Sequence, residues 1–222
     1  MRPIPVFVGY DPQEAVAYHV CSNSIVRHAT QPVAIVPMAL NLFGDYQETH
    51  SDGSNSFIYT RFLVPYLMNY KGTAVFIDGD MVLRDDIGKL FDIIDNDSAV
   101  AVVKHCYQTR QPIKYLGNAN PDYPRKNWSS VIVWNCGHPD NRVLTPEYVQ
   151  SQPGSHLHRF AWLSDNAIAE LLPEWNWLPD EYGENPAAKL LHYTLGTPCF
   201  PDYAATPQAA AWHQERKLTQ HP

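Results

Sequence analysis

Strand-like and helix-like segments alternate through the first half of the chain, and this alternation constrains the fold more than any other feature. Strands that are separated by helices form a mostly parallel sheet, because a parallel strand needs a long crossover connection. The sequence therefore predicts an α/β fold with helices flanking a mostly parallel central sheet. The expected strands are 5–8, 33–38, 73–77 and 99–103, and the expected helices are 12–29, 57–70 and 85–91.

The second half of the chain is richer in loops. Thirteen of the nineteen prolines and all six tryptophans lie after residue 110, which indicates short elements with aromatic side chains packed between them. Here we expect a strand at 131–135, a helix at 164–172 and a strand at 189–193, with a peripheral helix after residue 203. A chain of 222 residues is expected to form a single domain.

The charge balance argues against two classes of partner. Sixteen basic and twenty-three acidic residues give a net charge of −7, whereas nucleic acids and anionic membranes bind clustered cations. No apolar run reaches the roughly 18 residues of a transmembrane helix, and the N-terminus lacks the apolar stretch of a signal peptide. The four scattered cysteines are typical of reduced core thiols. We therefore expect a cytoplasmic protein with no nucleic-acid partner and no transmembrane segment.

The most specific motif is Asp78-Gly79-Asp80, which directly follows the apolar run 73–77. Side chains two residues apart in an extended segment point the same way, so both carboxylates face one spot. Ligand sites of open α/β sheets lie at such strand ends, and paired carboxylates suit Mg²⁺ or Mn²⁺ with a substrate phosphate. Gly79 would let the backbone approach that ligand closely. The alternative is an Asp-Gly turn with two solvated acids.

Residues 78–82 also match the DxDx[TV] motif that follows an apolar strand in HAD phosphatases. In that interpretation Asp78 would be the attacked nucleophile and Asp80 the acid/base. The HAD pattern also needs an acidic pair after a later strand, and no later strand ends in DD or GDxxxD. A phosphohydrolase is therefore the second hypothesis, with an incomplete motif.

Several blocks, in order along most of the chain, resemble the retaining glycosyltransferases of family 8 and their bacterial relatives, which have a GT-A fold. Residues 59–67 are similar to their Y-x-R-x-x-x-P-x-L helix, and residues 76–91 to their hhDxDhhh…DI…LF block. The other similar blocks are residues 6–11, 129–135, 162–168 and 192–200. The resemblance implies one GT-A-like domain over 1–222. Its expected parts are a nucleotide-binding half at 1–105, an acceptor-side half at 106–203 and a peripheral tail at 204–222.

The resemblance also implies a metal site and a donor site. Asp78, Asp80 and His192 would hold Mn²⁺ or Mg²⁺, which would neutralise charge on the departing nucleotide diphosphate. The donor contacts that it implies are Tyr10, Asp11, Arg61, Asp78, Gly79, Asn135 and Gly196.

Four of these residues have ordinary structural alternatives. His192 could be a hydrogen-bonded core histidine, and Asp11 the N-cap of the following helix. Arg61 could be a solvated or ion-paired residue on a helix face, whereas its functional role would be to contact the donor or to orient Asp80. Asn135 could be a cap at the end of a strand.

Asp165 and Asn166 are the implied catalytic residues. An amide such as Asn166 is a poor nucleophile, so we expect no covalent intermediate there. We expect same-face transfer in which the departing phosphate helps to deprotonate the acceptor, while Asp165 stabilises the cationic sugar or binds its hydroxyls. The structural alternative for Asp165 is a helix cap.

This sequence departs from the family's terminal H-F-x-G-x-x-K-P-W block. Residues 196–200 contain no lysine where that block has one. A cation that contacts the diphosphate would have to come from elsewhere. The candidates are Arg61, Lys104, Arg125, Lys126 and Lys189. The segment 104–128 is expected to be an acceptor-side loop, and its own cations are expected to be solvated.

The sequence as a whole thus predicts a metal-dependent, retaining glycosyltransferase. Its donor would be a nucleotide-diphospho sugar, with a UDP-hexose expected, and its acceptor a carbohydrate or glycoconjugate. The missing lysine keeps a third hypothesis open, which is a nucleotide-sugar-binding protein that has lost catalysis.

Overall fold

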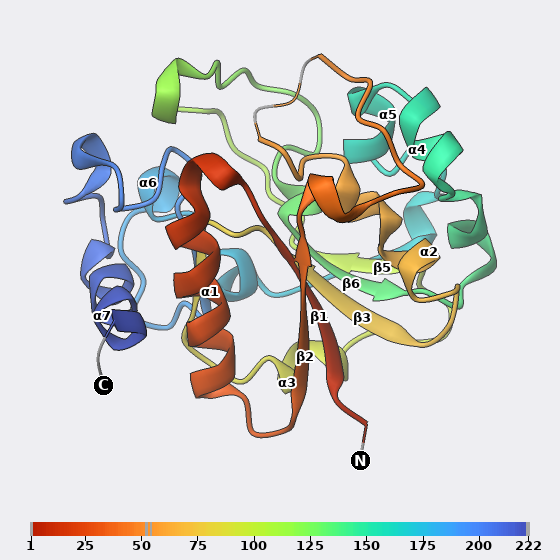
Figure 1. Cartoon of the computed structure of the whole chain (residues 1–222), viewed down its shortest axis with the longest axis horizontal. Helices are drawn as coiled ribbons and strands as arrows, with labels where there is room; N and C mark the ends of the chain where they lie inside the picture. The colour runs from red at the N-terminus through yellow and green to blue at the C-terminus, as the bar shows by residue number, and fades with distance from the viewer. Residues whose placement is uncertain (1, 52, 54, 221–222) are drawn as a thin grey trace.

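Six strands form the central sheet of the computed structural model, which describes residues 2–51, 53 and 55–220 (Figure 1). They are β1 (Ile4–Gly9), β2 (Val33–Met38), β3 (Thr73–Ile77), β5 (Val100–Val102), β6 (Val131–Asn135) and β7 (Ile168–Glu170). Their order across the sheet is β2-β1-β3-β6-β5-β7. β6 is antiparallel to both of its neighbours, whereas the other pairs are parallel. The predicted α/β class with a mostly parallel sheet is confirmed.

Helices cover both faces of this sheet (Figure 1). α1 (Ala15–His28) lies on one face beside α7 (Ala209–Gln220), and α2 (Val64–Leu67) lies on the other. Successive side chains of β3 point to opposite faces of the sheet and so contribute to both hydrophobic cores. Phe76 packs in one core with Val64, and Ile77 packs in the other with Ile25. The remaining helices are α3 (Gly88–Phe91), α4 (Pro146–Ser151), α5 (Gly154–His158) and α6 (Pro179–Tyr182). None of the helices in the described residues is long and apolar enough to cross a membrane.

A second, two-stranded sheet joins distant parts of the chain. β4 (Met81–Leu83) pairs antiparallel with β8 (Leu190–His192), so that Met81 lies opposite His192. The Tyr193 backbone N–H donates to the Asp80 carbonyl oxygen at 3.1 Å. This pairing fixes a residue near the end of the chain beside the Asp78-Gly79-Asp80 segment.

The helix predicted at 164–172 is wrong. A 3₁₀ turn at Asp165–Ala167 leads into β7, which extends the sheet beside β5. Ile168 packs in one core and Ala169 against the other, which is strand rather than helix behaviour. The parallel pairing with β5 gives the backbone of this segment its hydrogen bonds. A helix this short would be only marginally stable.

The helix predicted at 57–70 is shorter than expected. A 3₁₀ turn at Thr60–Leu63 continues into α2, which ends at Leu67. Asn69 and Tyr70 both adopt left-handed backbone angles, with φ of 51° and 52°, and so stop the helix before Gly72. The predicted peripheral helix after residue 203 is confirmed as α7.

The four cysteines do not all lie in the core. Cys21 and Cys136 are buried, whereas Cys106 is exposed and Cys199 is half-buried. The prediction of core thiols is therefore right for two of the four residues.

Gly79 offers a test of how tightly the turn after β3 is packed against β1. A methyl group at Gly79 would lie 2.3 Å from the Gly9 carbonyl oxygen, which belongs to the backbone and cannot rotate away. We expect Gly79→Ala to lower the free energy of unfolding by about 1–3 kcal/mol, the usual cost of overpacking. Thermal unfolding measures this. Gly44→Ala is the matched control, because among the described residues no atom beyond its two chain neighbours lies within 4 Å of the added methyl group. Equal unfolding temperatures for the two variants would contradict the expectation.

Candidate active site

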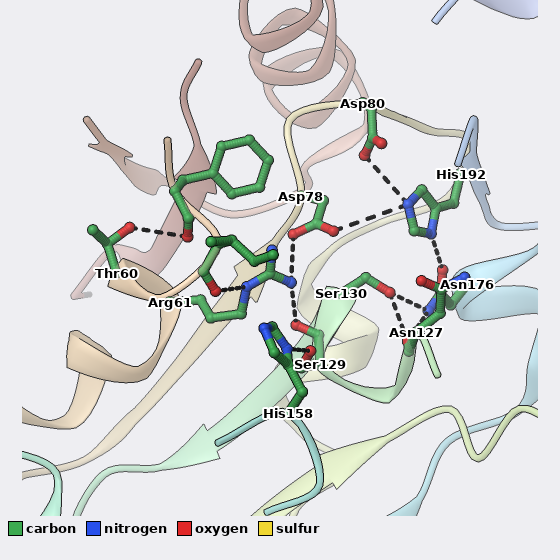
Figure 2. A network of polar contacts seen from close by, with 12 residues as sticks. Thr60, Arg61, Asp78, Asp80, Asn127, Ser129, Ser130, His158, Asn176 and His192 are labelled. Atoms are coloured by element: carbon green, nitrogen blue, oxygen red, sulfur yellow. Dashed lines mark hydrogen bonds and ion pairs between the residues drawn. The ribbon is translucent and has the colours of Figure 1, made fainter. Parts of the chain in front are cut away.

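A buried carboxylate, a half-buried carboxylate and a buried imidazole converge where β3 ends (Figure 2). Asp78 follows β3, and its backbone N–H donates to the Ser130 carbonyl oxygen across the sheet. Asp80 precedes β4, and His192 ends β8. Ligand atoms of the three side chains all lie within 4.8 Å of one another. The structure thus brings together the three residues that were predicted to bind a metal.

Arg61 compensates the charge of Asp78. Its guanidinium lies 2.8 Å from Asp78 Oδ1 and donates to the carbonyl oxygens of Ile58 and Ser129. The group also lies over the Phe76 ring, 5.0 Å from its centroid. Arg61 therefore holds Asp78, and not Asp80, the carboxylate that the sequence interpretation had it orient.

The tautomer of His192 is set by Asn176. His192 Nδ1 lies 2.9 Å from Asn176 Oδ1, and an amide oxygen can only accept. The amide nitrogen of Asn176 donates to Ser130 Oγ and to the Asn127 carbonyl oxygen, which fixes the orientation of the amide (Figure 2). In the neutral imidazole, Nδ1 therefore carries the proton and Nε2 offers a lone pair toward the carboxylates.

The distances from His192 to the two carboxylates suit ligands of one divalent cation. His192 Nε2 lies 3.4 Å from Asp80 Oδ1 and 3.9 Å from Asp78 Oδ2. Two ligands of one Mg²⁺ ion, each about 2.0–2.1 Å from it, can be at most about 4.2 Å apart. Among the described residues, no hydrogen bond reaches the buried Asp80 Oδ1. A carboxylate oxygen left in this state is suited to a cation.

Burial makes the site unfavourable for uncompensated negative charge. It raises the pKa of Asp78 to about 6, against the lowering effect of the Arg61 guanidinium, and the Asp80 carboxylate adds to the rise. Glu14, which follows the Asp11 cap, is also buried. Burial raises its pKa to about 8, and Asp80 adds to this, while the hydroxyls of Tyr115 and Thr197 act in the opposite direction.

A cavity of about 160 Å³ opens over the two carboxylates. Of the predicted site residues, its walls include Arg61, Asp78, Asp80 and His192. The other walls come from residues outside the predicted metal and donor sites, although Lys126 was named as a candidate cation for the diphosphate. They include Lys114, Tyr115, Asn120, Tyr123, Lys126, Asn127, Ser129, Ser130 and His158.

Some residues that the sequence analysis did not identify help to build the site. His158 Nδ1 lies 2.7 Å from Ser129 Oγ, and burial lowers the pKa of His158 well below its usual value. Asn176 sits between Trp175 and Trp177, and a polar residue flanked by two tryptophans is the one local signal that could have identified it. Lys126 is buried, so the expectation that the cations of this loop are solvated is wrong there.

Two predicted donor residues lie at the end of β1. Asp11 is buried and caps the turn after β1, because its carboxylate accepts from the backbone N–H groups of Gln13 and Ser56. Asp11 is therefore the N-cap that the sequence analysis gave as its structural alternative. Tyr10 packs edge-on against Tyr18 of α1. Neither residue lines the cavity over the carboxylates.

The two predicted glycines have close protein neighbours. Gly79 abuts the backbone of Gly9, and a methyl group at Gly196 would lie 2.6 Å from the Tyr203 ring. The close approach that requires a glycine at position 79 is therefore with the backbone of β1.

The structure does not bring Asn135 to the site. β6 runs antiparallel to β3, so Asn135 lies opposite Thr73, at the far end of β3 from Asp78. Its side chain donates to the Ser98 carbonyl oxygen, as a strand-end cap does. Antiparallel pairing brings the start of β6, and not its end, to the carboxylates.

Asp165 and Asn166 lie on the surface, outside the walls of the cavity. The Asp165 side chain is 82% exposed and forms an ion pair with Arg125 at 2.6 Å. Arg125 directly precedes Lys126 and Asn127, which do line the cavity. The structure therefore ties Asp165 to the cavity through Arg125 without placing it inside.

The raised pKa of Glu14 predicts a pH-dependent stability. Below the unfolded pKa, near 4.5, Glu14 is protonated in both states and has no effect. As the pH rises toward 8, the unfolded chain loses this proton while the folded chain keeps it, so stability falls. We expect Glu14→Gln to raise the unfolding temperature more at pH 8.5 than at pH 5.0, measured with EDTA present. The exposed Glu147→Gln is the control, and a Glu14→Gln gain that does not grow with pH would contradict the expectation.

Two sequence comparisons identify relatives of the chain. The model of Glycosyl transferase family 8 matches residues 5–137. Protein CDI of Arabidopsis thaliana is 40% identical over 223 residues, which cover 96% of this chain and 86% of that protein.

Solved structures share the fold at low identity. The bifunctional glycosyltransferase WbbM has a TM-score of 0.72 at 17% identity, covering 96% of this chain and 49% of its own. The galactosyltransferase LgtC, solved with donor and acceptor sugar analogues, has a TM-score of 0.66 at 13% identity, covering 99% and 97%. The glycosyltransferase GlyE of Streptococcus pneumoniae TIGR4 has a TM-score of 0.63 at 13% identity, covering 97% and 60%. The chain thus spans about half of WbbM.

The family match includes the Asp78-Gly79-Asp80 motif, on which the phosphohydrolase hypothesis rested, so that hypothesis loses its support. The matched family, the relative at 40% identity and the shared GT-A fold agree with the resemblance found in the sequence. The chain belongs to glycosyl transferase family 8 and is a glycosyltransferase.

Proposed function

We propose that this protein is a metal-dependent, retaining glycosyltransferase that moves a hexose from a nucleotide-diphospho sugar to a carbohydrate or glycoconjugate. The observation that carries the proposal is the convergence of Asp78, Asp80 and His192, with Asn176 Oδ1 held 2.9 Å from His192 Nδ1. Carboxylate and imidazole ligands suit Mn²⁺ or Mg²⁺. We propose a UDP-hexose as the donor.

The proposed transfer exchanges one bond for another. The bond between the anomeric carbon and the diphosphate oxygen breaks, and its electron pair stays on that oxygen. The acceptor oxygen bonds to the anomeric carbon on the same face, and its proton passes to a phosphate oxygen of the departing nucleoside diphosphate. A divalent cation would supply positive charge near the leaving oxygen. The chain's own part is to hold the carboxylates in place through Arg61 and the imidazole through Asn176.

The proposed division of labour follows the two halves of the chain. Residues 1–105 would bind the donor nucleotide, with Tyr10 and Asp11 at the end of β1. Residues 106–203 would face the acceptor, and residues 204–220 contribute α7 on the outside of the fold. An open groove lined by Asp11, Asn55 and Asn118 lies beside the cavity and supports a nucleoside position there.

The nucleotide-binding proposal predicts stabilisation that needs both metal and nucleotide. UDP with Mn²⁺ should raise the unfolding temperature, because a ligand at about 100 times its dissociation constant adds about 2.7 kcal/mol of stability. Asp80→Asn should remove the metal-dependent part of this shift, since an amide is a weaker cation ligand. Asp85→Asn, at an ion pair with Lys89 outside the cavity, is the control.

Other outcomes separate the alternatives. An unchanged shift of the unfolding temperature in Asp80→Asn would contradict the metal site. A shift with GDP and not with UDP would identify the donor as a GDP-sugar instead. A protein that binds a UDP-sugar with Mn²⁺ but neither hydrolyses nor transfers it would be an inactive binding protein. Turnover of p-nitrophenyl phosphate would favour the phosphohydrolase.

The catalytic role of Asp165 stays a proposal. It is supported by the resemblance of the segment 162–168 and by the ion pair with Arg125, next to Lys126 and Asn127 at the cavity. We expect Asp165→Asn to lower turnover of a UDP-sugar by 10-fold or more, a typical order for one charge-stabilising group, while UDP still binds. The exposed Asp202→Asn is the control. Normal turnover in Asp165→Asn would show that this residue has no catalytic part.

A further inference from the structure

One aromatic side chain in the wall of the cavity over Asp78 and Asp80 is partly open to solvent. Tyr123 is 38% exposed, and of the large hydrophobic side chains that are exposed in the described part of the chain it alone lines this cavity. Single exposed apolar residues are common on protein surfaces and need no explanation. A partly exposed ring in the wall of a polar cavity is a different case, because ligand sites combine such rings with a few placed polar groups.

The polar end of Tyr123 faces the charged part of the cavity. Burial raises the pKa of Tyr123, the Arg61 guanidinium and the Asn127 backbone N–H lower it, and the Asp78 carboxylate raises it. These groups act on the phenol oxygen, so the hydroxyl lies inward among them while part of the ring stays open. Tyr123 therefore offers an apolar surface and a hydroxyl to the same cavity.

The loop that carries Tyr123 is held in place on both sides of this residue. Before it, the Asp122 carboxylate accepts from the Thr109 backbone N–H at 2.9 Å. After it, the Lys126 ammonium donates to Asn120 Oδ1 at 2.7 Å and lies over the Tyr123 ring, 5.7 Å from its centroid. The open area of the ring is what this contact leaves uncovered. A tyrosine on a fixed backbone loses little conformational entropy when a ligand packs on it.

The position of Tyr123 relative to the proposed nucleoside groove indicates which part of a donor it would meet. The groove and the cavity share Asn55, whereas Tyr123 and Asn127 line the cavity and are not part of the groove. In a nucleotide-diphospho sugar the diphosphate follows the nucleoside, and the hexose follows the diphosphate. With the diphosphate near Asp78 and Asp80, the hexose would lie at the end of the cavity where Tyr123 stands.

We propose that Tyr123 is a specificity-determining residue whose ring packs on the hexose ring of the donor. This inference rests on the proposed function. A hexose carries C–H groups on the faces of its ring and hydroxyls around its edge. One face would pack on the open part of the Tyr123 ring, which leaves the hydroxyls to polar residues of the same wall such as Asn127 and Ser129. The loop 104–128 then contributes to the donor site, although it lies in the half that was assigned to the acceptor.

The decisive quantity is the dissociation constant of a UDP-hexose divided by that of UDP, both measured by calorimetry in saturating Mn²⁺. UDP-glucose and UDP-galactose are the two probes. For the one that the unchanged protein binds more tightly, Tyr123→Ala should raise this ratio by about 5-fold or more, an order typical of one aromatic contact, while the affinity for UDP stays the same. Tyr123→Phe keeps the ring and should keep most of the hexose affinity. Tyr66→Ala removes a half-buried tyrosine of α2 outside the cavity wall and should change neither affinity.

Each other result overturns a defined part of the proposal. If Tyr123→Ala weakens UDP and UDP-hexose binding by the same factor, the residue only supports the folded site. If the ratio does not change, Tyr123 does not contact the donor hexose, while the proposed function stands. If Tyr123→Phe loses as much hexose affinity as Tyr123→Ala, the hydroxyl and not the ring makes the contact, and ring packing is wrong. If the unchanged protein binds neither UDP nor a UDP-hexose with Mn²⁺, the proposed donor itself fails and the role of Tyr123 fails with it.

Discussion

The ion pair between Arg61 and Asp78 is the interaction on which the rest of the site depends. A carboxylate that is buried at the end of a central strand is costly unless a countercharge and hydrogen bonds accompany it. Arg61 meets this requirement from the 3₁₀ turn before α2, and its bond to the Ser129 carbonyl oxygen also ties the start of β6 to the site. The guanidinium thus joins three segments of the chain around one carboxylate.

Asp80 and His192 depend on a second, long-range constraint. The β4–β8 pair places His192 beside Asp80 although 111 residues separate them along the chain. Trp175, Asn176 and Trp177 then support the imidazole, since Asn176 holds Nδ1 and the Trp177 carbonyl oxygen accepts from the His192 backbone N–H. A ligand whose orientation is fixed in advance loses little entropy when a cation binds, so this support would favour the proposed cation site.

The distribution of cations distinguishes this chain from the pattern that its sequence resembles. Two lysines, Lys114 and Lys126, line the cavity, and Lys126 also ties its own loop together through Asn120. Both belong to the loop 104–128, whose cations would be solvated if it were an ordinary surface loop. Instead the loop folds back onto the terminal segment through Tyr115, Leu195 and Phe200. These contacts hold the loop beside the charged cavity.

The sequence by itself determined the α/β class, the strands β1, β2, β3, β5, β6 and β8, and the pair of carboxylates at the end of β3, because apolar runs and the Asp78-Gly79-Asp80 motif are local signals. Only the tertiary structure decided that Ile168–Glu170 is a strand, that Asn135 lies at the far end of β3, and that Asn176 and Lys114 belong at the site. These outcomes follow from which strands pair and in which direction. Strand pairing depends on contacts between residues far apart in the chain, and no local pattern of side chains records them.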